Sequence, residues 1–149
     1  EQVGIALAAV PLVMVAMNAV YAACAYPFGK LSDRVSHQRL LLAGLAVLVS
    51  ADVVLAVSTH WVGLLLGVAL WGVHMGMTQG LLAAMVADTA PADLRGTAYG
   101  LLDLMGGLAM LAASVVAGLL WQYWGPAWTF GAGAMFSAVA MAALRWRRG

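Results

Sequence analysis

The stretch that decides the fold is Val53 to Ala87, VVLAVSTHWVGLLLGVALWGVHMGMTQGLLAAMVA, 35 residues without Asp, Glu, Lys or Arg. A membrane-spanning helix needs roughly 20 apolar residues, so this stretch is too long for a single span. The polar triplet Ser58-Thr59-His60 interrupts it. The stretch therefore predicts the end of one spanning helix followed by the whole of the next.

Two further runs lack charged side chains, and the same reasoning applies to them. Gln2 to Gly29 predicts one span, whereas the 41 residues from Leu104 to Leu144 are interrupted by the turn sequence Gln122 to Pro126 and predict two. We therefore predict an all-α fold, a polytopic transmembrane helix bundle with a kink at Pro11 in its first helix. The five predicted spans are about 4–28, 40–57, 61–87, 96–121 and 126–145.

The composition supports an integral membrane protein and excludes most other classes. Hydrophobic residues make up 64% of the chain, charged residues 9%, and the mean hydropathy is +0.95. A soluble domain is about 25% charged, so this chain has too few polar side chains to cover a surface in water. The lipid bilayer is the expected partner, and a net charge of +1 gives no reason to expect nucleic acid. The single cysteine, Cys24, cannot form an internal disulfide.

The basic residues predict how the chain is oriented in the membrane. All seven lie in three places, namely Lys30, Arg34 and Arg39 in one connection, Arg95 in another, and Arg145, Arg147 and Arg148 at the C-terminus. With five spans these places fall on one side, which the positive-inside rule makes cytoplasmic. We expect the cell inner membrane, with loops 30–39 and 88–95 and the C-terminus in the cytoplasm.

Small residues predict which helix faces pack together, because lipid offers no hydrophobic drive between helices. The third span carries Gly72, Gly76 and Gly80 at four-residue spacing. The fourth carries a stripe of small residues that we also expect to be a contact face. Its members are Gly96, Gly100, Gly107, Ser114 and Gly118.

Four polar residues within the spans are candidates for a substrate or proton pathway: Asn18, Asp52, His74 and Asp103. A charge at the bilayer centre costs about 2.5–3.5 kcal/mol on insertion scales, so such groups face protein or water. A carboxylate or an imidazole can carry a proton there. Hydrogen bonding between helices is the alternative, and the sequence leaves both open.

No pattern of an enzyme is present. The chain contains no HExxH, CxxC, GxSxG or phosphate-binding loop, so we expect neither a catalytic residue nor a cofactor. His37 falls in a predicted loop and His60 at a span end. Neither is placed to join His74 as a metal ligand, and we expect no metal site.

Two connections carry a more specific signal. The first reads Gly29-Lys30-Leu31-Ser32-Asp33-Arg34-Val35-Ser36-His37-Gln38-Arg39. It resembles the loop signature of the major facilitator superfamily at Gly29, Leu31, Asp33, Arg34 and Arg39. It departs at Ser36, where the family usually has glycine, and at His37 and Gln38, where basic residues are usual. The second connection, Asp88 followed by Arg95 and Gly96, resembles the family's other cytoplasmic connection.

The resemblance implies the last five of the twelve helices of a transporter, part of a six-helix half of a major facilitator fold. It implies a secondary active transporter of a small molecule that works by alternating access, and the overall character resembles a proton-coupled bacterial efflux permease. Asp33 would contact the missing N-terminal half, and Arg34 or Arg39 would pair with Asp88. The alternative is a self-standing membrane scaffold or oligomerising module derived from a transporter. Because the chain begins at Glu1 without an initiator Met, we expect a piece of a longer protein.

Overall fold

The computed structural model describes residues 10–146, which form five long α-helices. All five are long and apolar enough to cross a membrane. They are α1 (Val10–Ser32), α2 (His37–Val57), α3 (Trp61–Thr89), α4 (Arg95–Trp124) and α5 (Pro126–Trp146). The predicted all-α transmembrane bundle of five spans is thereby confirmed. Pro11 lies in the first turn of α1, and residues 4–9 of the predicted first span lie outside the described residues, so the predicted kink is not tested.

The helices extend further than the apolar runs alone indicated. The connection between α1 and α2 is only residues 33–36, and a single residue, Gly125, separates α4 from α5. Polar side chains at the membrane surface do not stop a helix, because its backbone hydrogen bonds continue through them. Gly125 does stop α4, since its φ of 89° lies in a region that glycine adopts without steric cost.

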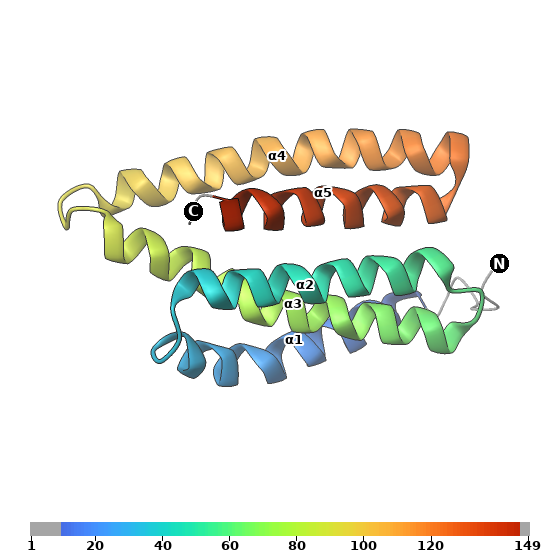
Figure 1. The fold of residues 1–149 in the computed structure, drawn as a ribbon, viewed down its shortest axis with the longest axis horizontal. Coiled ribbons are helices and arrows are strands. Elements are labelled where there is room, and N and C mark those ends of the chain that lie inside the picture. Colours follow the sequence, from blue (N-terminus) through green and yellow to red (C-terminus); the bar gives the residue numbers. More distant parts are fainter. Residues whose placement is uncertain (1–9, 147–149) are drawn as a thin grey trace.

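Successive helices run in opposite directions (Figure 1). The α1–α2 connection, the α3–α4 connection and the C-terminal end of α5 lie together at one end of the bundle, as expected for five spans. The helix ends at this side carry basic residues: Lys30 in the last turn of α1, Arg95 at the start of α4 and Arg145 in the last turn of α5. The α2–α3 and α4–α5 connections lie at the opposite end.

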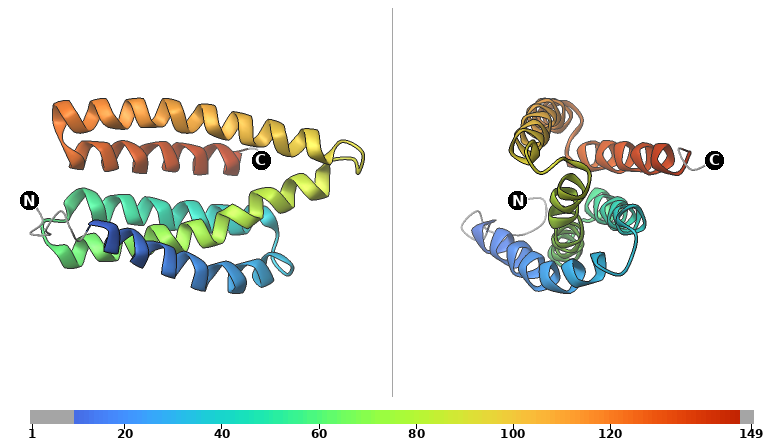
Figure 2. Two further views of the ribbon diagram at one scale, coloured as in Figure 1. Left: turned by 180° about the vertical axis from the view of Figure 1, so that it is seen from behind. Right: turned by 90° about the vertical axis from the view of Figure 1, so that its left-hand side faces the viewer.

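The packing is uneven across the bundle. Helix α3 packs against both α1 and α2, and α2 packs against α5. Helix α4 packs mainly against α5 and touches α3 at few points, and it contains no buried residue. Seen end-on, α4 lies at the edge of the bundle (Figure 2). A small core of Leu40, Met77 and Leu81 joins α2 to α3.

Glycines of α3 form the predicted contact face with α1. A Cβ built on Gly72 would lie 2.7 Å from the Met17 carbonyl oxygen, and one on Gly76 would lie 2.7 Å from Cys24 Cβ. Such distances are too short for a side chain, so the two helices approach as closely as glycine allows. The same test finds nothing within 4 Å of Gly80, where the two helices have separated.

The predicted contact face of α4 is wrong for this part of the chain. A Cβ at Gly96, Gly100, Gly107 or Gly118 would have no neighbour within 4 Å among the described residues. Residues 10–146 contain no helix placed against this stripe. The small residues are present, but their partner is not among the described helices.

Candidate functional site

The first signature loop is a compact turn at the end of the bundle. The Ser32 hydroxyl donates to the Gly29 carbonyl over 2.6 Å, and the backbone N–H groups of Arg34 and Val35 both donate to the Leu31 carbonyl over 3.0 Å. Gly29 makes no close contact with another helix among the described residues, because nothing there lies within 4 Å of a Cβ built on it.

The charged residues of the loop point outward. Asp33, Arg34 and Arg39 are exposed, and none forms an ion pair with another described residue. The predicted pairing of Arg34 or Arg39 with Asp88 is therefore wrong here. Asp88 instead lies 3.6 Å from Nδ1 of His37, an ion pair only when the imidazole is protonated. His37 is the first residue of α2 and faces the end of α3, whereas Arg34 lies within the turn.

Gln38 makes a second contact at the same end. Its side-chain Nε2 donates to the carbonyl of Leu144 over 2.9 Å, close to the C-terminal end of α5. A helix leaves its last carbonyls without partners, so this bond satisfies one of them. His37 and Gln38 thus join the start of α2 to the ends of α3 and α5. Sequence reasoning treated both residues only as departures from the family pattern and missed these contacts.

The second signature connection opens α4. Arg95 is the first residue of this helix, and both Arg95 and Gly96 are exposed. One turn later the Tyr99 hydroxyl donates to the carbonyl of Ala83 on α3 over 3.1 Å. This bond ties the start of α4 to α3. Sequence reasoning missed Tyr99, although its spacing of four from Arg95 places both on one helix face.

His74 bonds to a neighbouring helix. Its Nδ1 lies 2.8 Å from the carbonyl oxygen of Gly44 on α2, and because a carbonyl only accepts, Nδ1 is the donor. Thr78, one turn further along α3, packs on Gly44 as well: its Cγ2 would lie 2.6 Å from a Cβ there. The Thr78 hydroxyl donates to the His74 carbonyl over 2.9 Å. This geometry is that of interhelical hydrogen bonding, the alternative that the sequence left open for His74.

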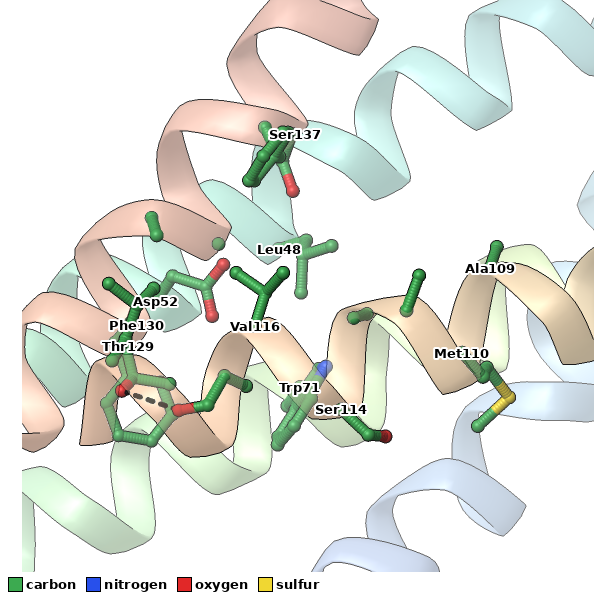
Figure 3. A pocket seen from close by; sticks show the side chains of 17 residues that line it. Leu48, Asp52, Trp71, Ala109, Met110, Ser114, Val116, Thr129, Phe130 and Ser137 are labelled. Carbon is green, nitrogen blue, oxygen red and sulfur yellow. Dashed lines mark hydrogen bonds between the residues drawn. The ribbon is translucent and has the colours of Figure 1, made fainter. Parts of the chain in front are cut away.

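A cavity of about 790 Å³ lies between α4 and the helices that face it (Figure 3). Its walls are mostly apolar, with Asp52, Ser114, Thr129 and Ser137 as the hydroxyl and carboxyl groups. Residues from α2, α3, α4 and α5 line it, including Leu48, Trp71, Ala113, Val116, Phe130 and Gly133. A hydrogen bond from the Thr129 hydroxyl to the Ala117 carbonyl, 3.4 Å long, crosses from α5 to α4 at one side.

Asp52 is the one candidate pathway residue that lines this cavity. Its exposed fraction is 6%. A Cβ built on Gly133 of α5 would lie 2.8 Å from Oδ2, so the absence of a side chain at Gly133 makes room for the carboxylate. Figure 3 shows the carboxylate pointing into the cavity toward Val116. Asp52 makes no hydrogen bond with any of residues 10–146 that the structure records.

The remaining two candidates lie elsewhere. Asp103 is exposed on α4 and does not line the cavity. Asn18 is exposed on α1, and its side-chain nitrogen donates to the Met14 carbonyl of its own helix over 2.8 Å. The structure therefore does not bring Asn18, Asp52, His74 and Asp103 together in one site.

Comparison with known proteins identifies the family. The sequence pattern of the Major Facilitator Superfamily matches residues 1–149, the whole chain. The chain therefore belongs to the major facilitator superfamily, and it is a multi-pass membrane protein of a transporter family and not an enzyme family.

Two curated relatives are transporters. An uncharacterised transporter of the same superfamily from Methanocaldococcus jannaschii is 33% identical over 123 residues, which are 83% of this chain and 31% of that protein. The inner membrane transport protein YajR of Escherichia coli is 31% identical over 94 residues, which are 63% of this chain and 20% of that protein. The matched regions thus span a third or less of these relatives.

Proposed function

We propose that this chain is the C-terminal portion of a secondary active transporter that moves a small molecule across the cell inner membrane by alternating access. The observation that carries this proposal is the pair of contacts made by His37 and Gln38. They hold α2, α3 and α5 together at the end that bears the signature loops. Rocking of two halves requires each half to move as one body, and such contacts favour that behaviour.

The exposed charges of the first loop are suited to contact a second half. Asp33, Arg34 and Arg39 project from the same end without an ionic partner among residues 10–146. In a complete transporter they would meet the N-terminal half when the cytoplasmic side closes. We assign loops 30–39 and 88–95 and the C-terminus to the cytoplasm, supported by the basic residues that lie there.

We further propose that transport is coupled to protons and directed outward. Asp52 supports the coupling, because a buried carboxylate facing a cavity can bind and release a proton. His74 remains a second candidate, although its Nδ1 is engaged by the Gly44 carbonyl. The outward direction is supported only by the resemblance to efflux permeases. The substrate site would be shared with the N-terminal half, so this chain supplies part of it.

Substitution in the first loop tests the gate. In the complete protein we expect Asp33→Asn to lower transport into inverted membrane vesicles by about fivefold or more, the size of a typical coupling energy. The protein level in the membrane should not change, because Asp33 is exposed. Asp93→Asn is the matched control, an exposed carboxylate in the other connection at the same end. Equal transport by the parent and the Asp33 variant would refute the gate role.

The pH profile tests the coupling. If Asp52 carries the proton, Asp52→Asn should remove the dependence of uptake on an imposed pH gradient while downhill exchange of substrate continues. His74→Ala should then keep that dependence. The reverse result would assign the proton to His74, and a preserved dependence in both variants would exclude this chain from the proton path.

A further inference from the structure

The start of α2 is joined to two neighbouring helices by contacts of different chemistry. The Gln38 side chain donates a 2.9 Å hydrogen bond to the Leu144 carbonyl of α5, and neither group changes its charge with pH. One residue earlier, Nδ1 of His37 lies 3.6 Å from Oδ2 of Asp88 in the last turn of α3. This distance is too long for a hydrogen bond, so the attraction requires a protonated, positively charged imidazole. The contact with α3 therefore depends on pH, whereas the contact with α5 does not.

Asp88 depends on a positive charge from outside its own helix. The dipole of α3 disfavours a negative charge in its last turn, and this turn contains no basic residue. Among residues 10–146, His37 is the ion-pair partner that the structure gives Asp88. The side chains of His37 and Asp88 are 31% and 64% exposed, so water reaches both and can exchange protons with the imidazole. Because the charge of histidine ordinarily changes between pH 5 and 8, the compensation of Asp88 varies within this range.

The other charged side chains at this end of the bundle do not replace His37. They come from the ends of α1, α2, α4 and α5 and from the two connections, and all are exposed without an ion pair in the described part of the chain: Lys30, Asp33, Arg34, Arg39, Asp93, Arg95 and Arg145. Lysine, arginine and aspartate ordinarily keep their charge between pH 5 and 8, so these residues contribute a constant field. A change of the contact within this range therefore comes from His37.

We propose that His37 and Asp88 form a pH-sensitive switch at this end of the bundle. At acidic pH the ion pair holds the start of α2 to the end of α3, and this attraction is lost as the pH rises and the imidazole becomes neutral. The hydrogen bond from Gln38 to α5 persists throughout, so one neighbour of α2 is released and the other is kept. The switch itself does not depend on the proposed function. Its consequence does, since helices that move as one body would be held together more firmly when the cytoplasm is acidic.

Hydrogen exchange of the complete protein in lipid nanodiscs tests the switch without requiring transport. The parent is compared at about pH 5.5 and about pH 8 with His37→Arg, which stays charged, and with His37→Gln, which stays neutral. Proteins are compared at the same pH, because exchange itself depends on pH. The control is His60→Gln, which changes an exposed histidine at the start of α3, at the opposite end of the bundle.

The last turn of α3 is where we expect the differences. At about pH 5.5 the parent should exchange there as slowly as His37→Arg, and at about pH 8 it should exchange as fast as His37→Gln. The difference between the two variants should be about two- to fivefold, which is the usual size for an exposed ion pair. Exchange at the C-terminal end of α5 should be equal in all of them, and His60→Gln should behave as the parent does.

Asp88→Asn gives the same test without a change at residue 37. Relative to the parent, this variant should exchange faster in the last turn of α3 at the acidic pH and equally at the alkaline pH. A ratio that does not change with pH would overturn the inference, as would a parent that matches His37→Arg at both pH values. Neither result would affect the proposed function. Conversely, a complete protein without transport activity that still shows the switch would overturn only the proposed function.

Discussion

Two helices of this protein carry the same pattern of small residues and have different surroundings. On α3, Gly72 and Gly76 lie against the backbone of α1, so close that a methyl group would not fit. On α4, Gly96 and Gly100 are also four residues apart and Gly107 follows two turns later, yet a Cβ built on any of the three has no neighbour within 4 Å among residues 10–146. The spacing of glycines shows that a face can receive a helix, but it does not show which helix. In lipid, where burial of apolar surface does not drive association, that depends on the presence of a complementary neighbour.

The two helices also differ in how many contacts hold them to the rest of the chain. Helix α3 is held on two sides, by α1 and α2, and the contacts of His37 and Gln38 reinforce the end of this group. Helix α4 is attached through α5, through the single residue Gly125, and through the bond from Tyr99 to Ala83. A helix held so sparsely by its own chain is suited to receive its remaining contacts from another part of the protein.

The largest effect expected is at the contact between α1 and α3. Gly72→Ala places a methyl group 2.7 Å from the Met17 carbonyl oxygen and 3.1 Å from Val20 Cβ. We expect a loss of about 1–3 kcal/mol in the free energy of unfolding, the usual cost of overpacking. The measurement is unfolding of the complete protein in bicelles by steric trapping.

Gly107→Ala is the matched control on α4. Nothing among the described residues opposes the methyl group, and alanine is the better helix former by up to about 1 kcal/mol. In the 149-residue chain this change should therefore stabilise. If Gly107→Ala instead lowered the free energy of unfolding of the complete protein, another segment would have to cover Gly107. If Gly72→Ala and Gly107→Ala lowered the free energy of unfolding of the 149-residue chain equally, the contrast between α3 and α4 would be contradicted.

A smaller effect is expected where α2 meets α3. A Cβ on Gly44 lies 2.6 Å from Cγ2 of Thr78, and a β-branched side chain has little freedom to move away. We expect Gly44→Ala to cost about 1–2 kcal/mol. Thr78→Ser removes the opposing methyl group and keeps the hydroxyl that bonds to the His74 carbonyl. A double-mutant cycle should show that this second change restores part of the loss, and strict additivity would mean that the two groups do not meet.

Tyr99→Phe tests how α4 is attached. It removes the 3.1 Å hydrogen bond to the Ala83 carbonyl, which should lower the free energy of unfolding by about 0.5–1.5 kcal/mol. Hydrogen exchange in the first turns of α4 should increase, while α2 and α3 keep their protection. Tyr26→Phe is the control, because Tyr26 is 78% exposed and should tolerate the loss of its hydroxyl. Uniform loss of protection across the bundle would show that α4 is not attached independently.

The smallest effect is expected at the pair of His37 and Asp88. Asp88 is largely exposed, so removing the contact by His37→Ala should cost less than about 1 kcal/mol. On the proposed function the two halves meet at this end, so loss of the contact should affect transport more than stability. Asp88→Asn should give the same transport phenotype. If either change lowers stability by several kcal/mol, the pair is part of the core packing and not of the gate.

Much of the fold could be predicted from the sequence, because the length of a stretch without charged residues indicates how many times it can cross the membrane. Ser58-Thr59-His60 correctly divided the 35-residue run from Val53 to Ala87, whereas the turn assigned to Gln122–Pro126 proved to be Gly125 alone. Gly72 and Gly76 were predicted as contact residues, and the structure confirms this. The contacts of His37, Gln38 and Tyr99 could not be predicted, because each one joins two helices whose relative placement is decided by packing.

The sequence by itself determined that this is a membrane protein, how many spans it contains and which family it belongs to. These properties depend on local hydropathy and short motifs, which can be recognised without knowing which helices are in contact. Only the tertiary structure decided that His74 bonds to Gly44, that Asp103 faces outward, and that Asp52 faces a cavity. The direction of a polar side chain in a bundle depends on helix rotation, and rotation is set by packing against the other helices.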